Sequence, residues 1–127
     1  MSTTSDRRAI IDAVLAQLAA IRRGGWGAAH GHLSEELQRR WSLEEFAEVA
    51  RSGYAPLIDS VGQRVERLTV EGDVAQLRLA LMQADGTTLV AHYELRREGG
   101  AWRVAGIALG ASVTAVVSMN GHHPPAG

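Results

Sequence analysis

The sequence contains no cysteine and no lysine, and each absence removes a class of chemistry. Without cysteine there is no thiol nucleophile, no disulfide bond and no cysteine-ligated zinc. All 13 cationic side chains are arginines, so the chain can form no lysine Schiff base and has no phosphate-loop lysine. Covalent catalysis through a thiol or an amine side chain is therefore excluded.

Net charge is also small, at −1, and it gives no electrostatic reason to expect nucleic acid or an anionic membrane. The most apolar window, Val104–Met119, is shorter than the ~20 residues that span a bilayer. Asp12 and Gln17 interrupt the apolar run near the N-terminus, which favours an amphipathic helix over a signal peptide. We expect a cytoplasmic protein with no cofactor, no nucleic-acid partner and no membrane partner.

The 127 residues, 46% hydrophobic and 21% charged, are enough for one domain with a real core. We expect a single domain over residues 1–119. Residues 120–127, which include two prolines and two glycines, are predicted to be a disordered tail.

The first half of the chain predicts helices. Apolar residues at helical spacing predict a first helix within residues 5–24, and short helices are expected at 28–33 and 35–39. A serine followed three residues later by glutamate is a capping box and predicts a helix over 42–53. Residues 54–57 are predicted to be a connector, because proline disfavours helical geometry in the residue before it.

The second half predicts strands joined by tight turns. Asp85-Gly86 and Gly99-Gly100 separate alternating segments, and such pairs favour hairpins because both turn residues need positive φ. The predicted fold class is α+β, with N-terminal helices packed on one face of a four-stranded antiparallel sheet. The expected strands are Val61–Glu71, Val74–Ala84, Thr87–Glu98 and Ala101–Leu109.

Two-residue loops in the last two hairpins predict the register in which the strands pair. They place Arg78 opposite Tyr93, and His92 opposite Ile107. Alternation along the strands then puts Tyr93 and Trp102 on one face, which we assign to the helices. The opposite face is also apolar and of a size rarely left exposed, so a second subunit is its simplest cover. The predicted homodimer interface consists of Leu77, Leu79, Leu81, Val90, His92, Ile107 and Leu109.

A ligand pocket is expected between the helices and the sheet. Arg78 and Tyr93 would orient a carboxylate or carbonyl group at the wall of this pocket. A structural alternative pairs Arg78 with Glu66, if the loop at Gly72-Asp73 holds one extra residue. The predicted ligand-binding residues are Gln76, Arg78, Tyr93, Trp102, Trp26 and Tyr54.

Four segments resemble an uncharacterised bacterial branch of the nuclear-transport-factor-two-like superfamily: QLAAIRRG at 17–24, GYAPL at 53–57, YELR at 93–96 and GAWRVAG at 100–106. The resemblance implies a cystatin-like fold, a curved sheet that forms a cone around a pocket. The superfamily includes ketosteroid isomerases, scytalone dehydratase, limonene epoxide hydrolase and polyketide cyclases, beside many non-enzymes. Its enzymes use an aspartate base, an Asp/His pair or an Asp-Arg-Asp set inside the cone.

The acidic residues of this chain depart from that pattern. Asp73 and Asp85 fall in turns, and Asp59 precedes the first strand, so no aspartate lies in the interior of a predicted strand. His92 and Glu94 share a strand face and could transfer protons, although a hydrogen bond within the dimer interface is the alternative. We predict no catalytic residue.

A second histidine pattern invites a metal interpretation, because glutamates follow His30 and His32. Positions two apart do not face each other on a helix, and no third ligand has suitable spacing, so no metal site is predicted.

Three functions remain open at this point. The preferred one is a non-catalytic homodimer that binds a small apolar or carboxylated molecule. The first alternative is an acid–base isomerase, dehydratase or cyclase that acts on a small hydrophobic substrate. The second alternative is a purely structural dimerisation domain with a filled cone.

Overall fold

The computed structural model describes residues 3–111 and 115–118 and confirms the predicted α+β class. A short fifth strand extends the four that were predicted, and the predicted tail at 120–127 lies outside the described residues. The helices are α1 (Thr3–Arg22), α2 (Trp26–Gly31), α3 (Glu35–Arg40), α4 (Leu43–Gly53) and α5 (Ala55–Asp59). The strands are β1 (Ser60–Glu71), β2 (Val74–Gln83), β3 (Thr88–Glu98), β4 (Ala101–Ala111) and β5 (Ala115–Ser118).

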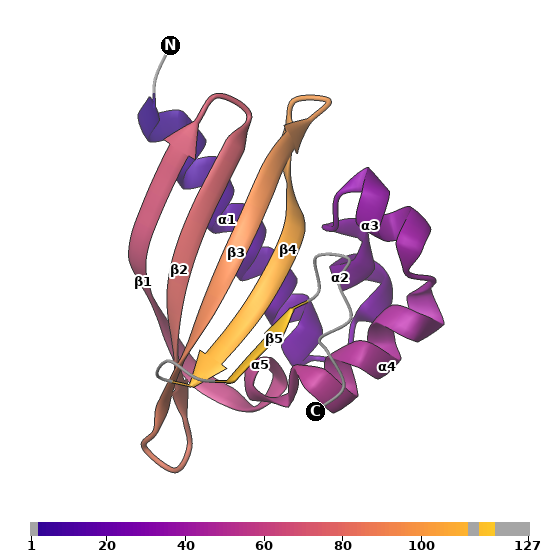
Figure 1. Cartoon of the computed structure of the whole chain (residues 1–127), viewed down its shortest axis with the longest axis vertical. Coiled ribbons are helices and arrows are strands. Elements are labelled where there is room, and N and C mark those ends of the chain that lie inside the picture. Colours follow the sequence, from indigo (N-terminus) through magenta and orange to yellow (C-terminus); the bar gives the residue numbers. More distant parts are fainter. Residues whose placement is uncertain (1–2, 112–114, 119–127) are drawn as a thin grey trace.

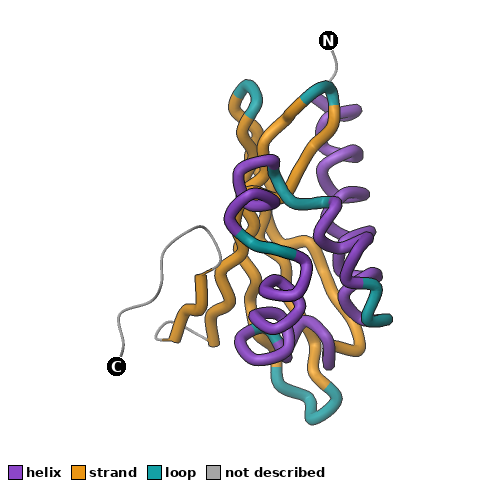
Figure 2. The backbone as a smooth tube through the Cα atoms, turned by 90° about the vertical axis from the view of Figure 1, so that its right-hand side faces the viewer, coloured by secondary structure: helices purple, strands orange, loops and turns teal. Residues whose placement is uncertain are grey.

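The strands form one antiparallel sheet in which each strand neighbours the next in the chain, from β1 to β5. Helix α1 runs diagonally behind this sheet in Figure 1, and the edge-on view in Figure 2 places it on one side. Helix α3 lies beside β4 rather than across the sheet. The sheet therefore has a helix-covered face and a face turned away from α1, which we call the open face.

Local signals explain most element boundaries. The capping box of α4 is present: the Glu45 amide donates to Ser42 Oγ over 3.1 Å, and the Ser42 amide donates to the Glu45 carboxylate over 3.0 Å. The connector predicted at residues 54–57 is wrong, because Ala55 opens the short helix α5. Its proline is in the first turn, where an amide has no partner within the helix, so the ring is tolerated there.

The link between α2 and α3 pairs with the edge of β4. The Ser34 amide donates to the Val104 carbonyl, and the Val104 amide donates to the His32 carbonyl, both over 2.8 Å. Leu33 is thereby bridged in parallel to Val104. Because Ser34 Oγ also caps α3 by accepting from the Leu37 amide, this pairing fixes α3 at the sheet edge.

The register predicted for β2 and β3 is wrong by one residue. The connection is longer than two residues, since the Gln83 amide donates to the Thr87 carbonyl over 2.8 Å; within this turn the Asp85 carboxylate accepts from both the amide and the hydroxyl of Thr87. Arg78 consequently lies opposite His92, not Tyr93. A slip of one residue turns every side chain of a strand to the other face, so the leucines of β2 join Tyr93 on the helix-covered face.

A β-bulge causes the second register error. The two-residue turn at Gly99-Gly100 forms as predicted, and Leu95 lies opposite Val104 as expected. The ladder then shifts next to Glu94, which places Ile107 opposite Tyr93. The far half of β4 therefore presents the opposite parity from the one predicted.

These two irregularities place most residues of the predicted dimer interface in the core. Tyr93 and Trp102 are buried on the helix-covered face, as predicted, but five residues assigned to the other face are buried with them. Those five are Leu77, Leu79, Leu81, Ile107 and Leu109. Only Val90 and His92 of the predicted interface lie on the open face. A single chain thus buries one apolar sheet face and leaves a polar one exposed, as antiparallel sheets commonly do.

Candidate functional site

The sheet separates the residues predicted to bind a ligand together. Tyr54, Tyr93 and Trp102 are core residues on the helix-covered side, whereas Gln76 and Arg78 are exposed on the open face. Trp26 packs half-buried against the same core as the three aromatic residues, with its ring 6.4 Å from that of Phe46 in α4. The six residues do not form one pocket.

The space between α1 and the sheet is filled by side chains, two of them buried phenols. The Tyr54 hydroxyl donates to the Ile107 carbonyl over 2.9 Å. The Tyr93 hydroxyl is buried and has no hydrogen-bond partner among the described residues. Burial raises the pKa of Tyr93, which the positive charge of Arg22 opposes; burial, with Tyr93 as a smaller cause, raises the pKa of Tyr54. Both phenols therefore stay protonated at neutral pH.

A matched pair of substitutions tests this account of the phenols. We expect Tyr54→Phe to lower the free energy of unfolding by about 1 kcal/mol, because it leaves the Ile107 carbonyl without its donor. Tyr93→Phe should cause no loss, because it removes a hydroxyl that has no described partner. Urea unfolding of both variants measures the difference. Equal losses would show that the Tyr93 hydroxyl is engaged.

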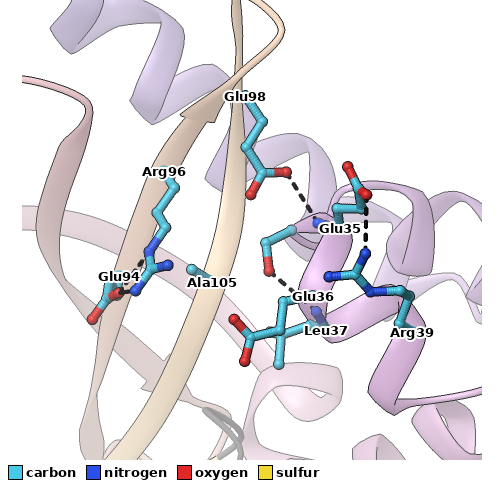
Figure 3. A pocket seen from close by; sticks show the side chains of 9 residues that line it. Glu35, Glu36, Leu37, Arg39, Glu94, Arg96, Glu98 and Ala105 are labelled. Carbon is cyan, nitrogen blue, oxygen red and sulfur yellow. Dashed lines mark hydrogen bonds and ion pairs between the residues drawn. The ribbon is translucent and has the colours of Figure 1, made fainter.

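A cleft of about 470 Å³ opens between α3 and strands β3 and β4, and Figure 3 shows it from close by. Its charges are largely matched at short range. Glu98 accepts from the Glu35 amide over 3.0 Å, and Arg39 pairs with the Glu35 carboxylate at 3.2 Å. Arg96 pairs with Glu94 at 3.2 Å on the sheet side. Because these charged groups are paired with one another, few of them are free to bind a ligand in the cleft.

A second hollow, of about 300 Å³, lies on the open face itself, and we call it the sheet-face hollow. It gathers side chains from three neighbouring strands: Arg67 lies opposite Arg78, and Arg78 lies opposite His92. The lining residues are Arg67, Thr69, Gln76, Leu77, Arg78 and His92. Two predicted ligand residues, Gln76 and Arg78, are thus kept together, but with new neighbours.

Among the described residues, Glu66 is the one carboxylate bonded to this cationic group. A register shift between Val65 and Arg67 lets it accept from Arg78 over 2.9 Å and from Arg64 over 3.1 Å. The Arg78–Glu66 pair considered from the sequence is confirmed, although a bulge produces it rather than a longer loop. Hydrogen bonds from Arg64 and then from Arg78 hold the pKa of the Glu66 carboxyl below its ordinary value.

The titration of Glu66 provides a second test. We expect its carboxyl to titrate below an ordinary glutamate, and Arg64→Gln or Arg78→Gln to move the pKa upward. Because the folded-state pKa is the lower one, the ion pairs stabilise the fold above the unfolded-state pKa. That contribution disappears as pH falls through the folded-state pKa. Carbon-13 NMR of the side-chain carboxyl measures this, and an unchanged pKa in both variants would contradict the pairing.

Two other histidines of the described residues, His30 and His32, lie away from this hollow. Nε2 of His30 lies 2.7 Å from the Trp41 carbonyl oxygen, a hydrogen-bond distance. Burial, followed by the charge of Arg103, lowers the pKa of His32. Glu94 pairs with Arg96 instead of His92. Within residues 3–111 and 115–118, no three histidine or acidic side chains are arranged to hold a metal ion, and we propose no metal centre.

The fold is that of nuclear-transport-factor-two-like proteins. It matches an NTF-2-like protein of unknown function from Silicibacter pomeroyi with a TM-score of 0.53 at 18% identity, over 82% of this chain and 93% of that one. A second such protein, from Shewanella oneidensis, gives 0.54 at 17% identity, over 78% and 93% of the two chains.

A third match is a putative NTF2-like transpeptidase from Campylobacter jejuni, with a TM-score of 0.55 at 13% identity over 72% and 93% of the two chains. At such identities these likenesses show the fold alone. The family of domains of unknown function DUF4864 matches residues 3–115, and the chain belongs to it. No curated protein matches the chain.

None of the helices in the described part of the chain is long and apolar enough to cross a membrane.

Proposed function

We propose that this chain is a non-catalytic binding domain that takes its ligand on the open face of the sheet. One contrast carries the proposal. The space between α1 and the sheet is packed with the domain's own side chains, and the hollow of about 770 Å³ beside α1 and α2 is lined mainly by alanine and glycine, whereas the open face has a hollow lined with exposed cationic and polar groups. Charged and polar groups can bind a ligand where they are exposed and have no partner within the protein.

Acid–base catalysis in the space between α1 and the sheet has less support. Apart from the two tyrosines, the buried polar residues in the described part of the chain are Gln17, Ser34 and Ser60. None of these is a carboxylate or an imidazole that could act as a base. We therefore place binding ahead of catalysis.

A homodimer through the open face stays a prediction, on changed grounds. The apolar residues that required a second subunit are core residues, so a substitution such as Leu79→Asp would test folding rather than association. Val90 and His92 are the members of the predicted interface that still lie on the open face. Val90→Arg is the appropriate variant, and sedimentation of wild type and variant measures assembly.

Native mass spectrometry of freshly purified protein tests the binding proposal. We expect a co-purified small molecule that is lost in Arg78→Ala and kept in Arg39→Ala, an exposed arginine with its own ion pair on α3. Both variants remove one arginine, so their difference reports position rather than charge. A molecule retained in Arg78→Ala but lost in Trp102→Phe would instead place the ligand on the helix-covered side and overturn the proposal.

A further inference from the structure

We propose that the sheet-face hollow is an anion site, which holds the oxyanion group of a small carboxylated or phosphorylated molecule between Arg67 and Arg78. The inference rests on the proposed function, because it names the ligand class for the same face. The observation behind it is the electrostatic repulsion between Arg67 and Arg78.

Arg67 and Arg78 lie directly opposite each other on β1 and β2. Like charges at such positions repel, because side chains of paired residues start only about 5 Å apart. Glu66 relieves the conflict on one side only, since its carboxylate is taken by Arg78 and Arg64. Arg67 has no hydrogen-bond or ion-pair partner among the described residues. An anion between the two guanidinium groups would resolve the repulsion.

The surrounding groups suit such an anion. Thr69 lies opposite Gln76, and His92 lies opposite Arg78, so a hydroxyl, an amide and an imidazole surround the two arginines. All three side chains are exposed and have no described partner. Arginine forks bind carboxylate and phosphate in a bidentate manner, and the hollow of about 300 Å³ accommodates a small organic anion.

The local charge also favours a doubly charged ligand. Glu66 is the only carboxylate bonded to Arg64 or Arg78 among the described residues, so Arg64, Arg67 and Arg78 keep two uncompensated positive charges. The flanking Glu94 is held by Arg96, and Glu71 lies farther along β1, beyond Thr69. This surplus occurs on a chain whose net charge is −1, so it is a local concentration rather than a general property.

The test is an NMR titration with inorganic phosphate and, in a separate arm, with succinate, at an ionic strength held constant with sodium chloride. We expect saturable shifts at the backbone amides of residues 67–69, 76–78 and 92. The arm with the tighter binding identifies the phosphorylated or the carboxylated class. Arg67→Gln should weaken binding about tenfold, as expected for one charge-assisted contact. Arg8→Gln makes the same charge change at an exposed position of α1 and should have no effect.

Three results would overturn the anion site. Shifts that rise linearly with anion, and equally in Arg67→Gln and Arg8→Gln, would show non-specific screening. Open-face shifts that depend on protein concentration alone would make a second copy of the chain the occupant. If the co-purified molecule depends on Arg78 while neither phosphate nor succinate binds, the anion class fails and the binding function stands. Circular dichroism of each variant confirms that it is folded.

Discussion

Leu79→Asp is expected to unfold the domain. Leu79 is fully buried in the centre of the helix-covered face, where it pairs with Ala91 and Val65. Truncating a buried leucine costs about 2–5 kcal/mol, and an unpaired buried carboxylate adds a further penalty. The sum is comparable to the entire stability of a small domain, about 5–15 kcal/mol. Far-ultraviolet circular dichroism and urea titration measure the loss.

Leu43→Asp is the matched control, because it makes the same substitution at a leucine that is 45% exposed. Leu43 is in the first turn of α4, where a carboxylate interacts favourably with the helix dipole, so we expect a change within about 0.5 kcal/mol. A Leu79→Asp protein that stays folded and loses only self-association would restore the register predicted from the sequence.

Trp102→Ala is expected to lower the free energy of unfolding by about 3–5 kcal/mol. The indole is 6% exposed, and the Arg97 guanidinium lies 5.2 Å from the ring centroid. Arg97 also pairs with Asp6 of α1 at 3.1 Å and with Asp73 of the β1–β2 turn at 2.9 Å. Removing the indole therefore opens a cavity and unseats an arginine that ties α1 to the sheet.

Trp26→Ala controls for the loss of a tryptophan as such. Trp26 is only half-buried, so its truncation is expected to cost less than that of Trp102. Urea unfolding, followed by circular dichroism because a fluorophore is removed, compares the two. If Trp102→Ala kept full stability and abolished ligand binding instead, Trp102 would be the ligand residue that the sequence suggested.

Local signals predicted the elements well because each acts within a few residues. Helical spacing, the Ser42–Glu45 capping box and the Gly99-Gly100 turn all correspond to described features. Register is different, since one extra residue reverses a whole strand. Here the Asp85 turn and the bulge next to Glu94 each add such a residue. The register predicted from the sequence made both faces of the sheet apolar. Shifting β2 by one residue, so that its leucines lie on the same face as Tyr93, would have corrected the first of the two register errors.

Only part of the candidate site was predicted, because the face of a residue within one strand is a local property whereas its neighbours depend on the register. Gln76 and Arg78 are two apart on one strand, so any register keeps them on the same face. Their neighbours depend on adjacent strands, and the sequence paired them with Tyr93 across an incorrect register. Arg67 was missed because its position depends on the bulge that follows Val65, for which no local sequence signal is known to us.

That bulge in β1 has a further consequence for how the protein behaves at high concentration. β1 is an outer strand of the sheet, and an outer strand invites pairing with a neighbouring molecule. Its ladder is broken both near Gly62 and at Glu66, and the Arg7 guanidinium already donates to the Leu68 carbonyl over 3.1 Å. A strand from another molecule would therefore meet an irregular, charged edge on which at least one backbone carbonyl is already hydrogen-bonded. The irregularity that positions Glu66 beside Arg78 thus also guards the domain against edge-to-edge polymerisation.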